Sequence, residues 1–164
     1  MSFDRELFAA AQHCVERNRA AGRQVTTAES CTGGLVSAAL TEIPGASDIF
    51  GRAFVTYSNE AKTEALGVPA ELLRRHGAVS EPVARAMATG ALRASGADIG
   101  VAVSGIAGPG GGSTARPVGT VAFARALRTA DGVELVSETR QFGDLGRGEV
   151  RRQAALVALG LLLP

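Results

Sequence analysis

The most constraining feature of the sequence is a nearly continuous apolar run, Ile99–Ser104 (IGVAVS), followed directly by the glycine-rich segment Gly105–Gly112. A strand with one face in water alternates apolar and polar residues, whereas a strand covered on both faces has no such alternation. The run therefore predicts a central strand buried between two layers, with a loop at its carboxyl end. We expect helices to form the two covering layers.

Weaker patterns along the chain supply the other elements. The further predicted strands are Val25–Ala28, Gly51–Tyr57, Gly119–Ala126 and Val133–Phe142. The predicted helices are Phe3–Ala21 with Ser2 as its cap, a stretch ending near Leu40, Ser58–Leu66, a short helix after Pro69, Ser80–Ser95, and Arg147 to about Leu162. The last two strands are expected to pair antiparallel through Asp131-Gly132, with a loop longer than two residues. Residues 1–164 are thus predicted to form a single α/β domain, a three-layer α/β/α fold with a mixed sheet.

Charge and composition exclude several classes of protein. Seventeen basic and sixteen acidic residues give a net charge of +1, so no bulk field attracts nucleic acid or an anionic membrane surface. The apolar runs are too short to span a bilayer and the first residues are polar, which favours a cytoplasmic protein. The two cysteines, Cys14 and Cys31, and the two histidines, His13 and His76, predict neither a disulfide framework nor a metal site.

One lysine stands apart from the arginine-rich composition. Lys62 is the only lysine in the chain, and Tyr57, five residues earlier, is the only tyrosine. An amine, unlike a guanidinium, can lose its proton near neutral pH when it is desolvated, so this lysine is a candidate general base. Drift within an arginine-biased composition explains the same observation equally simply.

Three junctions where a predicted strand meets a loop are the candidate sites: Glu29–Gly34, Tyr57–Lys62 and Ser104–Gly112. Strand ends in open α/β sheets converge on one edge, so these junctions are expected to meet. The first offers Ser30 and a helix start whose backbone N–H groups can bind phosphate or an oxyanion, although an ordinary capped turn has the same composition. The glycines of the third allow a close approach to a ligand. None of these segments has the pattern of a Walker loop or a dinucleotide-binding loop.

Two further observations concern single residues. Cys31 follows the candidate serine, but no histidine lies near it in sequence, so core packing is its expected role. Arg147 and Arg151 begin the last predicted helix, the end that the helix dipole makes unfavourable for cations. Their charge is expected to serve something other than helix stability, such as a bound phosphate or carboxylate.

Five motifs in one order resemble the CinA C-terminal domain family. These are Ala28–Gly34 (AESCTGG), Phe54–Lys62 (FVTYSNEAK), Gly77–Ser80 (GAVS), Ser104–Pro109 (SGIAGP) and Pro117–Val121 (PVGTV). The resemblance covers nearly the whole chain. The sequence is similar to the family's stand-alone form, which lacks an optional N-terminal domain. It implies hydrolysis of the carboxamide of nicotinamide mononucleotide to nicotinic acid mononucleotide and ammonia, in pyridine nucleotide recycling, with no metal or organic cofactor.

The resemblance also implies which residues form the site. The implied catalytic positions are Ser30, Ser47, Tyr57 and Lys62. The implied or expected substrate-binding positions are Thr32, Gly33, Gly34, Ser104, Gly105, Gly108, Gly110, Gly111 and Arg147. In the resulting hypothesis, neutral Lys62 takes the proton of a serine that attacks the carboxamide, and Tyr57 relays or stabilises that proton.

Several alternatives stay open from sequence. Ser30 lies beside a helix start and Ser47 lies in a Pro-Gly loop, and either could be the nucleophile. The Gly33-Gly34 turn and the Gly105–Gly112 loop could each hold the oxyanion or the phosphate. A non-catalytic nucleotide-binding module and an amidase for another small phosphorylated amide are the competing functions. A domain of this size with apolar helices is expected to form a homodimer.

Overall fold

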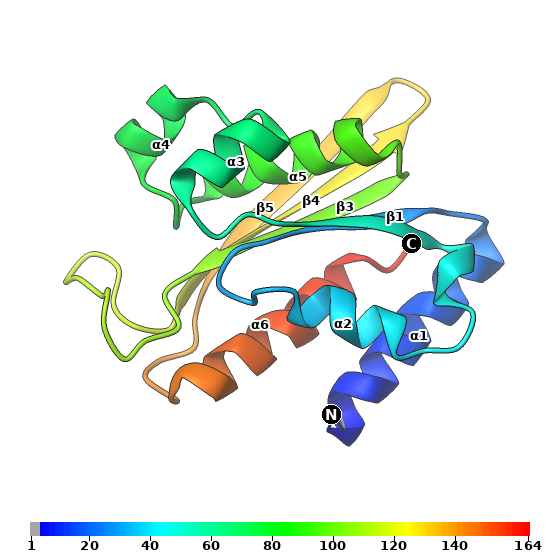
Figure 1. Cartoon of the computed structure of the whole chain (residues 1–164), viewed down its shortest axis with the longest axis horizontal. Coiled ribbons are helices and arrows are strands. Elements are labelled where there is room, and N and C mark those ends of the chain that lie inside the picture. Colours follow the sequence, from blue (N-terminus) through cyan, green and yellow to red (C-terminus); the bar gives the residue numbers. More distant parts are fainter. Residues whose placement is uncertain (1–3) are drawn as a thin grey trace.

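The computed structural model describes residues 4–164 and consists of a mixed five-stranded sheet between two layers of helices (Figure 1). The strands are β1 (Val25–Glu29), β2 (Phe50–Val55), β3 (Ile99–Gly105), β4 (Thr120–Thr129) and β5 (Gly132–Gln141), in the spatial order β2-β1-β3-β4-β5. The first three strands are parallel, and β4 is antiparallel to both of its neighbours. The predicted three-layer fold and the antiparallel pair are thereby confirmed.

Helices lie on both faces of the sheet (Figure 1). One layer contains α1 (Arg5–Ala21), α2 (Leu35–Thr41) and α6 (Arg147–Leu161), and the other contains α3 (Asn59–Leu66), α4 (Ala70–His76) and α5 (Glu81–Ser95). A three-residue 3₁₀ turn, η1 (Ala46–Asp48), precedes β2. None of the helices in residues 4–164 has the length and apolar character needed to cross a bilayer.

The central strand β3 has the double burial that its sequence predicts. Ile99, Val101 and Val103 pack into the core beneath α1, α2 and α6, and Ala102 packs into the core beneath α5. The α5 side is lined by small residues because the helix lies close to the sheet. A Cβ on Gly100 would come within 3.1 Å of the carbonyl oxygen of Ala88 in α5.

A second close approach determines where α3 lies. Gly90 of α5 faces the end of α3, and a Cβ there would stand 2.0 Å from the carbonyl oxygen of Leu66. Only a glycine allows the two helices to approach this closely. The contact therefore fixes the position of α3 over the sheet, and with it the position of Lys62.

Two details of the predicted elements differ from the structure. Helix α1 begins at Arg5 rather than Phe3, and Asp4 caps it by accepting a hydrogen bond of 2.9 Å from the Leu7 N–H; the predicted cap, Ser2, lies outside the described residues. The β4–β5 loop has only two residues, because Thr129 pairs directly with Gly132. Backbone pairing extends both strands beyond the apolar pattern, and this extension shortens the loop that the pattern predicts.

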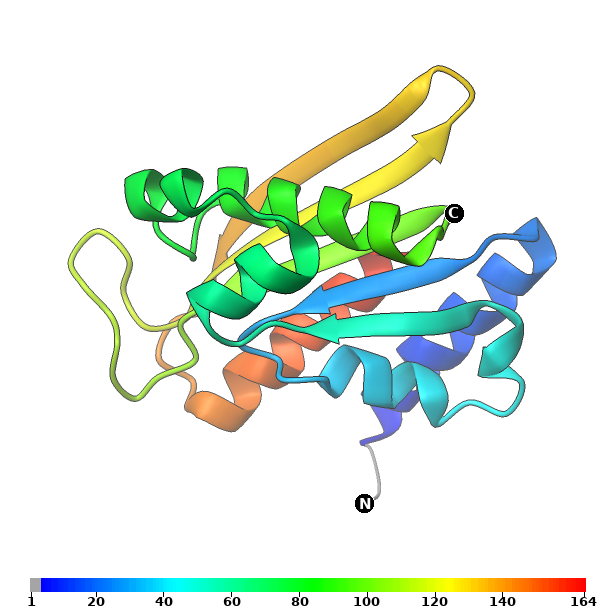
Figure 2. The same ribbon diagram turned by 45° about the horizontal axis from the view of Figure 1, so that its top comes forward.

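The carboxyl ends of β1, β2 and β3 lie at one edge of the sheet, as expected from their parallel directions (Figure 2). The glycine-rich loop after β3 leaves from this edge, and α6 begins beside it (Figure 2). The three candidate junctions therefore converge at one place.

Gly90→Ala is expected to lower the free energy of unfolding by about 1–3 kcal/mol, because the added methyl group forces α3 away from α5. Urea unfolding measures the change. Gly160→Ala is the matched control: it also adds a methyl group in a helix, but no atom lies within 4 Å of the new Cβ. The control is expected to raise stability by up to about 1 kcal/mol. Equal effects of the two changes would contradict the packing argument.

Candidate active site

The centre of the site is a completely buried lysine beside a serine. Lys62 is 0% exposed, and its Nζ lies 3.0 Å from the Oγ of Ser30. The same amine donates to the carbonyl oxygen of Thr56 at 2.7 Å and reaches those of Tyr57 and Ser58 at 3.4 Å. Its hydrogen-bond partners are therefore one hydroxyl group and backbone carbonyl groups.

Burial lowers the pKa of this amine. Desolvation lowers the pKa of Lys62 from its usual value, and nearby Cys31 and Glu60 oppose the shift only in part. A neutral lysine is a competent general base, since its lone pair can accept a proton from a hydroxyl group. The Ser30–Lys62 distance and the direction of this pKa shift are those that activation of a serine by a lysine would require.

Local helix structure explains how Lys62 reaches Ser30. Ser58 caps α3 by accepting a hydrogen bond of 3.0 Å from the Ala61 N–H, which starts the helix at Asn59. A side chain on a helix is directed back toward the N-terminus. The amine of Lys62, in the first turn, therefore lies beneath the carbonyl groups of the chain that enters the helix.

Ser30 lies in a tight turn between β1 and α2. Its N–H continues the sheet by donating to the Val103 carbonyl oxygen at 2.9 Å, and its own carbonyl oxygen accepts from the Gly33 N–H at 3.0 Å. Gly33 and Gly34 have φ angles of 59° and 94°, in the left-handed region that favours glycine. These glycines turn the chain sharply enough to leave Ser30 at the end of the strand, facing Lys62.

Glu29 is a structural residue of the site that the sequence analysis missed. Its carboxylate is fully buried and accepts hydrogen bonds from the N–H groups of Gly34, Val36 and Ser37, at 2.9–3.1 Å, and from the Ser37 hydroxyl. A carboxylate at a helix start is favourable, and a glutamate just before a Gly-Gly helix start is the sequence signal that would have indicated it. The N–H groups of Gly33 and Gly34 are already used, which corrects the expectation that they are free to hold an oxyanion or a phosphate.

A pocket of about 240 Å³ opens onto the serine and the lysine. Its lining residues are Ser30, Cys31, Tyr57, Asn59, Lys62, Ala78, Val79, Ser104, Gly105, Ala107 and Arg147. The structure thus brings six of the predicted site residues to one cavity, from the turn after β1, from β3, α3 and α6, and from the segment entering α3. Gly105 is required there, because a Cβ on it would meet Val121 at 2.7 Å and the Cys31 sulfur at 3.0 Å.

Arg147 provides an exposed cation at the mouth of the pocket. Its guanidinium donates to the hydroxyl group of Tyr57 and to the carbonyl oxygen of Gly108, both at 2.9 Å. The Tyr57 side chain is 61% exposed, and its hydroxyl contacts Arg147 rather than Lys62. An arginine and an aromatic ring together offer contacts for a planar, anionic ligand.

Other predicted site residues lie elsewhere. Ser47 is in η1, beyond the amino end of β2, where it lines a different depression together with Pro44 and Phe50. Gly110 and Gly111 are exposed in the loop after β3, and Thr32 is buried outside the pocket lining. The structure therefore places Ser30, and not Ser47, beside the lysine.

Cys31 lines the pocket but is poorly suited to be a nucleophile. Burial raises the pKa of its thiol to about 11, so the thiolate is rare at neutral pH. No group of three or more His, Cys, Asp or Glu side chains within residues 4–164 is arranged to hold a metal ion.

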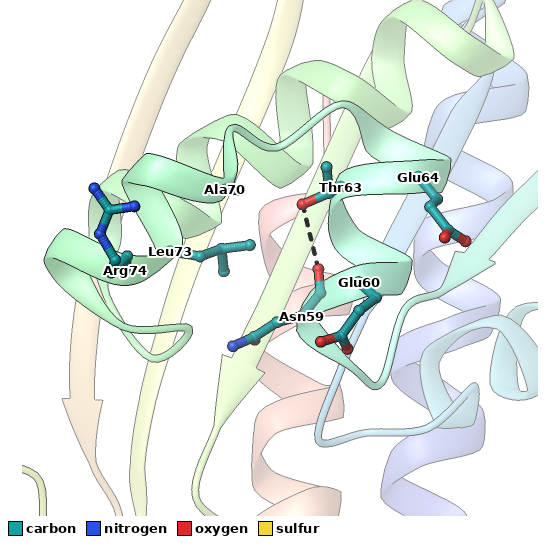
Figure 3. Close-up of a pocket in the computed structure, with 7 residues that line it drawn as sticks. All are labelled: Asn59, Glu60, Thr63, Glu64, Ala70, Leu73 and Arg74. Atoms are coloured by element: carbon teal, nitrogen blue, oxygen red, sulfur yellow. Dashed lines mark hydrogen bonds between the residues drawn. The ribbon is translucent and has the colours of Figure 1, made fainter.

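A larger depression, of about 520 Å³, lies between α3 and α4 (Figure 3). Asn59, Glu60, Thr63, Glu64, Ala70, Leu73 and Arg74 line it, and Asn59 also borders the pocket at Lys62. Figure 3 shows two carboxylates of α3 and the Arg74 guanidinium of α4 at this depression, where the Thr63 hydroxyl donates to the Asn59 carbonyl oxygen. We assign the site to the smaller pocket because the Ser30–Lys62 pair lies there.

Comparison with known proteins identifies relatives over almost the entire chain. The family model of the CinA C-terminal domain matches residues 8–164. The nicotinamide-nucleotide amidohydrolase PncC of Escherichia coli K12 is 50% identical over 159 residues, which cover 97% of this chain and 94% of that protein. A CinA-like protein of Mycobacterium sp. (strain JLS) is 55% identical over 142 residues, 87% of this chain and 33% of that protein. The chain spans about a third of the length of the first curated relatives that it matches.

Solved structures agree with these sequence relationships. The competence/damage inducible protein of Agrobacterium tumefaciens has a TM-score of 0.94 and 45% identity, covering 99% of this chain and 96% of that chain. A CinA superfamily protein of Klebsiella pneumoniae has a TM-score of 0.89 and 38% identity, over 95% of this chain and 94% of that chain.

Glu29→Gln is expected to lower the free energy of unfolding by about 1–3 kcal/mol, because an amide nitrogen would face N–H donors that now bind a carboxylate oxygen. Urea unfolding at neutral pH measures this loss. Glu42→Gln, at the exposed end of α2, makes the same chemical change and is expected to have little effect. A stable Glu29→Gln protein would contradict the role of Glu29 as the anchor of α2.

Proposed function

The chain belongs to the CinA C-terminal domain family, and from this membership we propose that it hydrolyses the carboxamide of nicotinamide mononucleotide, releasing ammonia and nicotinic acid mononucleotide. The observation that carries the proposal is the buried Lys62 amine 3.0 Å from the Ser30 hydroxyl, inside a pocket with an arginine at its mouth. The near full-length similarity to a protein named nicotinamide-nucleotide amidohydrolase supports the choice of substrate.

In the first half of the reaction, the neutral amine of Lys62 accepts the proton of Ser30 as the serine oxygen attacks the carboxamide carbon. The carbonyl oxygens of Thr56 and Tyr57 accept hydrogen bonds from the N–H groups of this amine. The nitrogen lone pair is then left to accept the serine proton. The resulting ammonium group returns this proton to the amide nitrogen, the C–N bond breaks, and ammonia leaves. Ser30 then carries the nicotinoyl group as an ester.

The second half repeats the proton transfers with water. Lys62, neutral again, takes a proton from a water molecule that attacks the ester carbon, and the ammonium group then protonates the leaving Ser30 oxygen. The product is a carboxylic acid, which loses its proton to the solvent, and the enzyme returns to its starting state. Neither half of the reaction oxidises or reduces any atom, so the proposed steps need no oxidant or reductant.

Substrate binding is assigned to the mouth of the pocket. In this proposal Arg147 binds the phosphate group, because a guanidinium pairs with phosphate oxygens through two parallel N–H donors. The exposed ring of Tyr57 provides a flat apolar surface for the pyridine ring, held in place by its hydrogen bond to Arg147. The alternative role of Tyr57, a proton relay, lacks a hydrogen bond from its hydroxyl to Lys62 or Ser30.

Two other functions use the same site less well. A binding module without activity has no need to bury a lysine against a serine, which costs desolvation free energy. An amidase for another small phosphorylated amide would use the same residues, and only the substrate distinguishes it. We therefore rank nicotinamide mononucleotide first and other phosphorylated amides second.

The purified protein is expected to release ammonia from nicotinamide mononucleotide but not from free nicotinamide, which lacks the phosphate that Arg147 binds. Ser30→Ala and Lys62→Ala are each expected to lower kcat by at least about 10²–10⁴-fold, the usual contribution of such a group. Ser47→Ala is the matched control and is expected to retain kcat. Ammonia release in a coupled assay measures all of these rates.

Loss of turnover in Ser47→Ala but not in Ser30→Ala would transfer the nucleophile to Ser47 and overturn our assignment. Nucleotide binding without turnover by the folded wild-type protein would favour the binding module instead.

The pH dependence provides a separate test. Because the reaction needs neutral Lys62, kcat/KM should rise with pH and level off above the pKa of this lysine, which burial places below its ordinary value of about 10.4. Activity is therefore lost as the pH falls through that pKa. A rate profile from about pH 6 to about pH 10 measures it, and a rate independent of pH over this range would argue against a lysine base.

A further inference from the structure

We propose that Arg151 is a positioning residue for the reaction: by binding the carbonyl oxygens of Cys31 and Thr32, it holds the turn that carries Ser30. The inference rests on the proposed function, because it assigns the task of Arg151 to the same site. Arg151 does not line the pocket, so it acts through the backbone rather than on the substrate.

The contacts are bidentate and cross between two distant parts of the chain. The Nε of Arg151 donates to the Cys31 carbonyl oxygen at 3.1 Å, and its Nη2 donates to the Thr32 carbonyl oxygen at 3.0 Å. The same guanidinium passes 3.5 Å from the position of a Cβ on Gly33. One planar, partly buried cation thus spans two successive peptide groups immediately after Ser30.

The geometry of the peptide bond converts these contacts into control of the turn. In a trans peptide, the C=O and the following N–H point in opposite directions within one plane. Binding the Cys31 oxygen to Arg151 therefore fixes the direction of the Thr32 N–H. The preceding peptide is fixed in the same way, because the Ser30 oxygen accepts from the Gly33 N–H.

Little else in the turn could perform this task. The hydroxyl group of Thr32 is buried and has no hydrogen-bond partner within the described part of the chain, so it provides no brace of its own. The Leu35 N–H also donates to the Thr32 carbonyl oxygen, at 3.1 Å. Within residues 4–164, no group besides Arg151 donates to the Cys31 carbonyl oxygen. A shift of the turn would move Ser30 away from Lys62, and misplacement by about 1 Å can cost about 10²-fold in rate.

The role of Arg151 helps to explain why two cations lie near the N-terminus of α6, where the helix dipole is unfavourable for positive charge. Arg147 and Arg151 are four residues apart, so they project from the same face of the helix. That face lies over the sheet edge that carries the candidate site, where Arg147 contacts Tyr57 and Arg151 contacts the Ser30 turn. The next residue, Arg152, is directed elsewhere and pairs with Asp4 and Glu6 of the N-terminal region.

The test compares the two adjacent arginines. Arg151→Ala is expected to lower kcat for nicotinamide mononucleotide by about 10–100-fold while KM changes by less than about threefold, since the substrate contacts remain. Arg151→Lys should recover only part of the loss, because an ammonium group cannot span both carbonyl oxygens in one plane. Arg152→Ala, the matched control, should lose stability but keep kcat within about twofold of the wild type.

Added guanidinium ion, at concentrations well below those that unfold the protein, provides a rescue that a merely structural role would not show. It should raise the kcat of Arg151→Ala and leave that of Arg152→Ala unchanged. A folded Arg151→Ala protein with wild-type kcat, or a loss that appears only in KM, would overturn the proposal.

Amide hydrogen exchange tests the same proposal without any turnover. The Gly33 N–H, bonded to the Ser30 oxygen, should exchange at least about tenfold faster in Arg151→Ala or Arg151→Lys than in Arg152→Ala. Unchanged exchange in both Arg151 variants would refute the positioning role even if the enzyme proved inactive on every amide. Faster exchange together with an inactive wild type would retain the positioning role and refute the proposed reaction instead.

Discussion

The buried amine of Lys62 is the group on which the candidate site at the edge of the sheet depends. A charged or polar group with no exposure is costly unless its hydrogen bonds are satisfied, and the backbone oxygens from Thr56 to Ser58, with the Ser30 hydroxyl, satisfy them. This requirement links the end of β2, the start of α3 and the turn after β1. The close packing of α3 on α5 at Gly90 then sets how deep the lysine lies.

A second buried side chain, Glu29, is also satisfied largely by backbone groups. Its partners are N–H groups at the start of α2, so it stabilises that helix and occupies its donors. The Ser30 turn is therefore held at its N-terminal end by the sheet, at its C-terminal end by Glu29, and in the middle by Arg151. A turn restrained at three points is well suited to hold a nucleophile in one position.

Membership of the CinA C-terminal domain family and the arrangement of the pocket contribute different parts of the functional argument. The family relationship supports the proposed substrate, because relatives covered over nearly their whole length are named nicotinamide-nucleotide amidohydrolases. The pocket points to serine chemistry with a lysine base, from distances and burial alone. The two arguments are independent, and both support the hydrolysis that we propose.

Much of the fold follows from local sequence. The uninterrupted apolar run Ile99–Ser104 predicts a doubly buried strand, glycine and proline mark where helices end or begin, and Lys62 is distinguished as the only lysine in the sequence. Strand ends and caps were less well determined: Asp4 and the two-residue β4–β5 loop reflect backbone hydrogen bonds that extend past the apolar pattern. Only the tertiary structure shows that Ser30, and not Ser47, lies beside Lys62, that the N–H group of Gly34 binds Glu29, and that Arg151 reaches the Cys31 carbonyl oxygen across 120 residues. Hydrophobic periodicity reports which face of an element is buried, whereas these contacts depend on how the elements are packed at the end of the sheet, which no local pattern encodes.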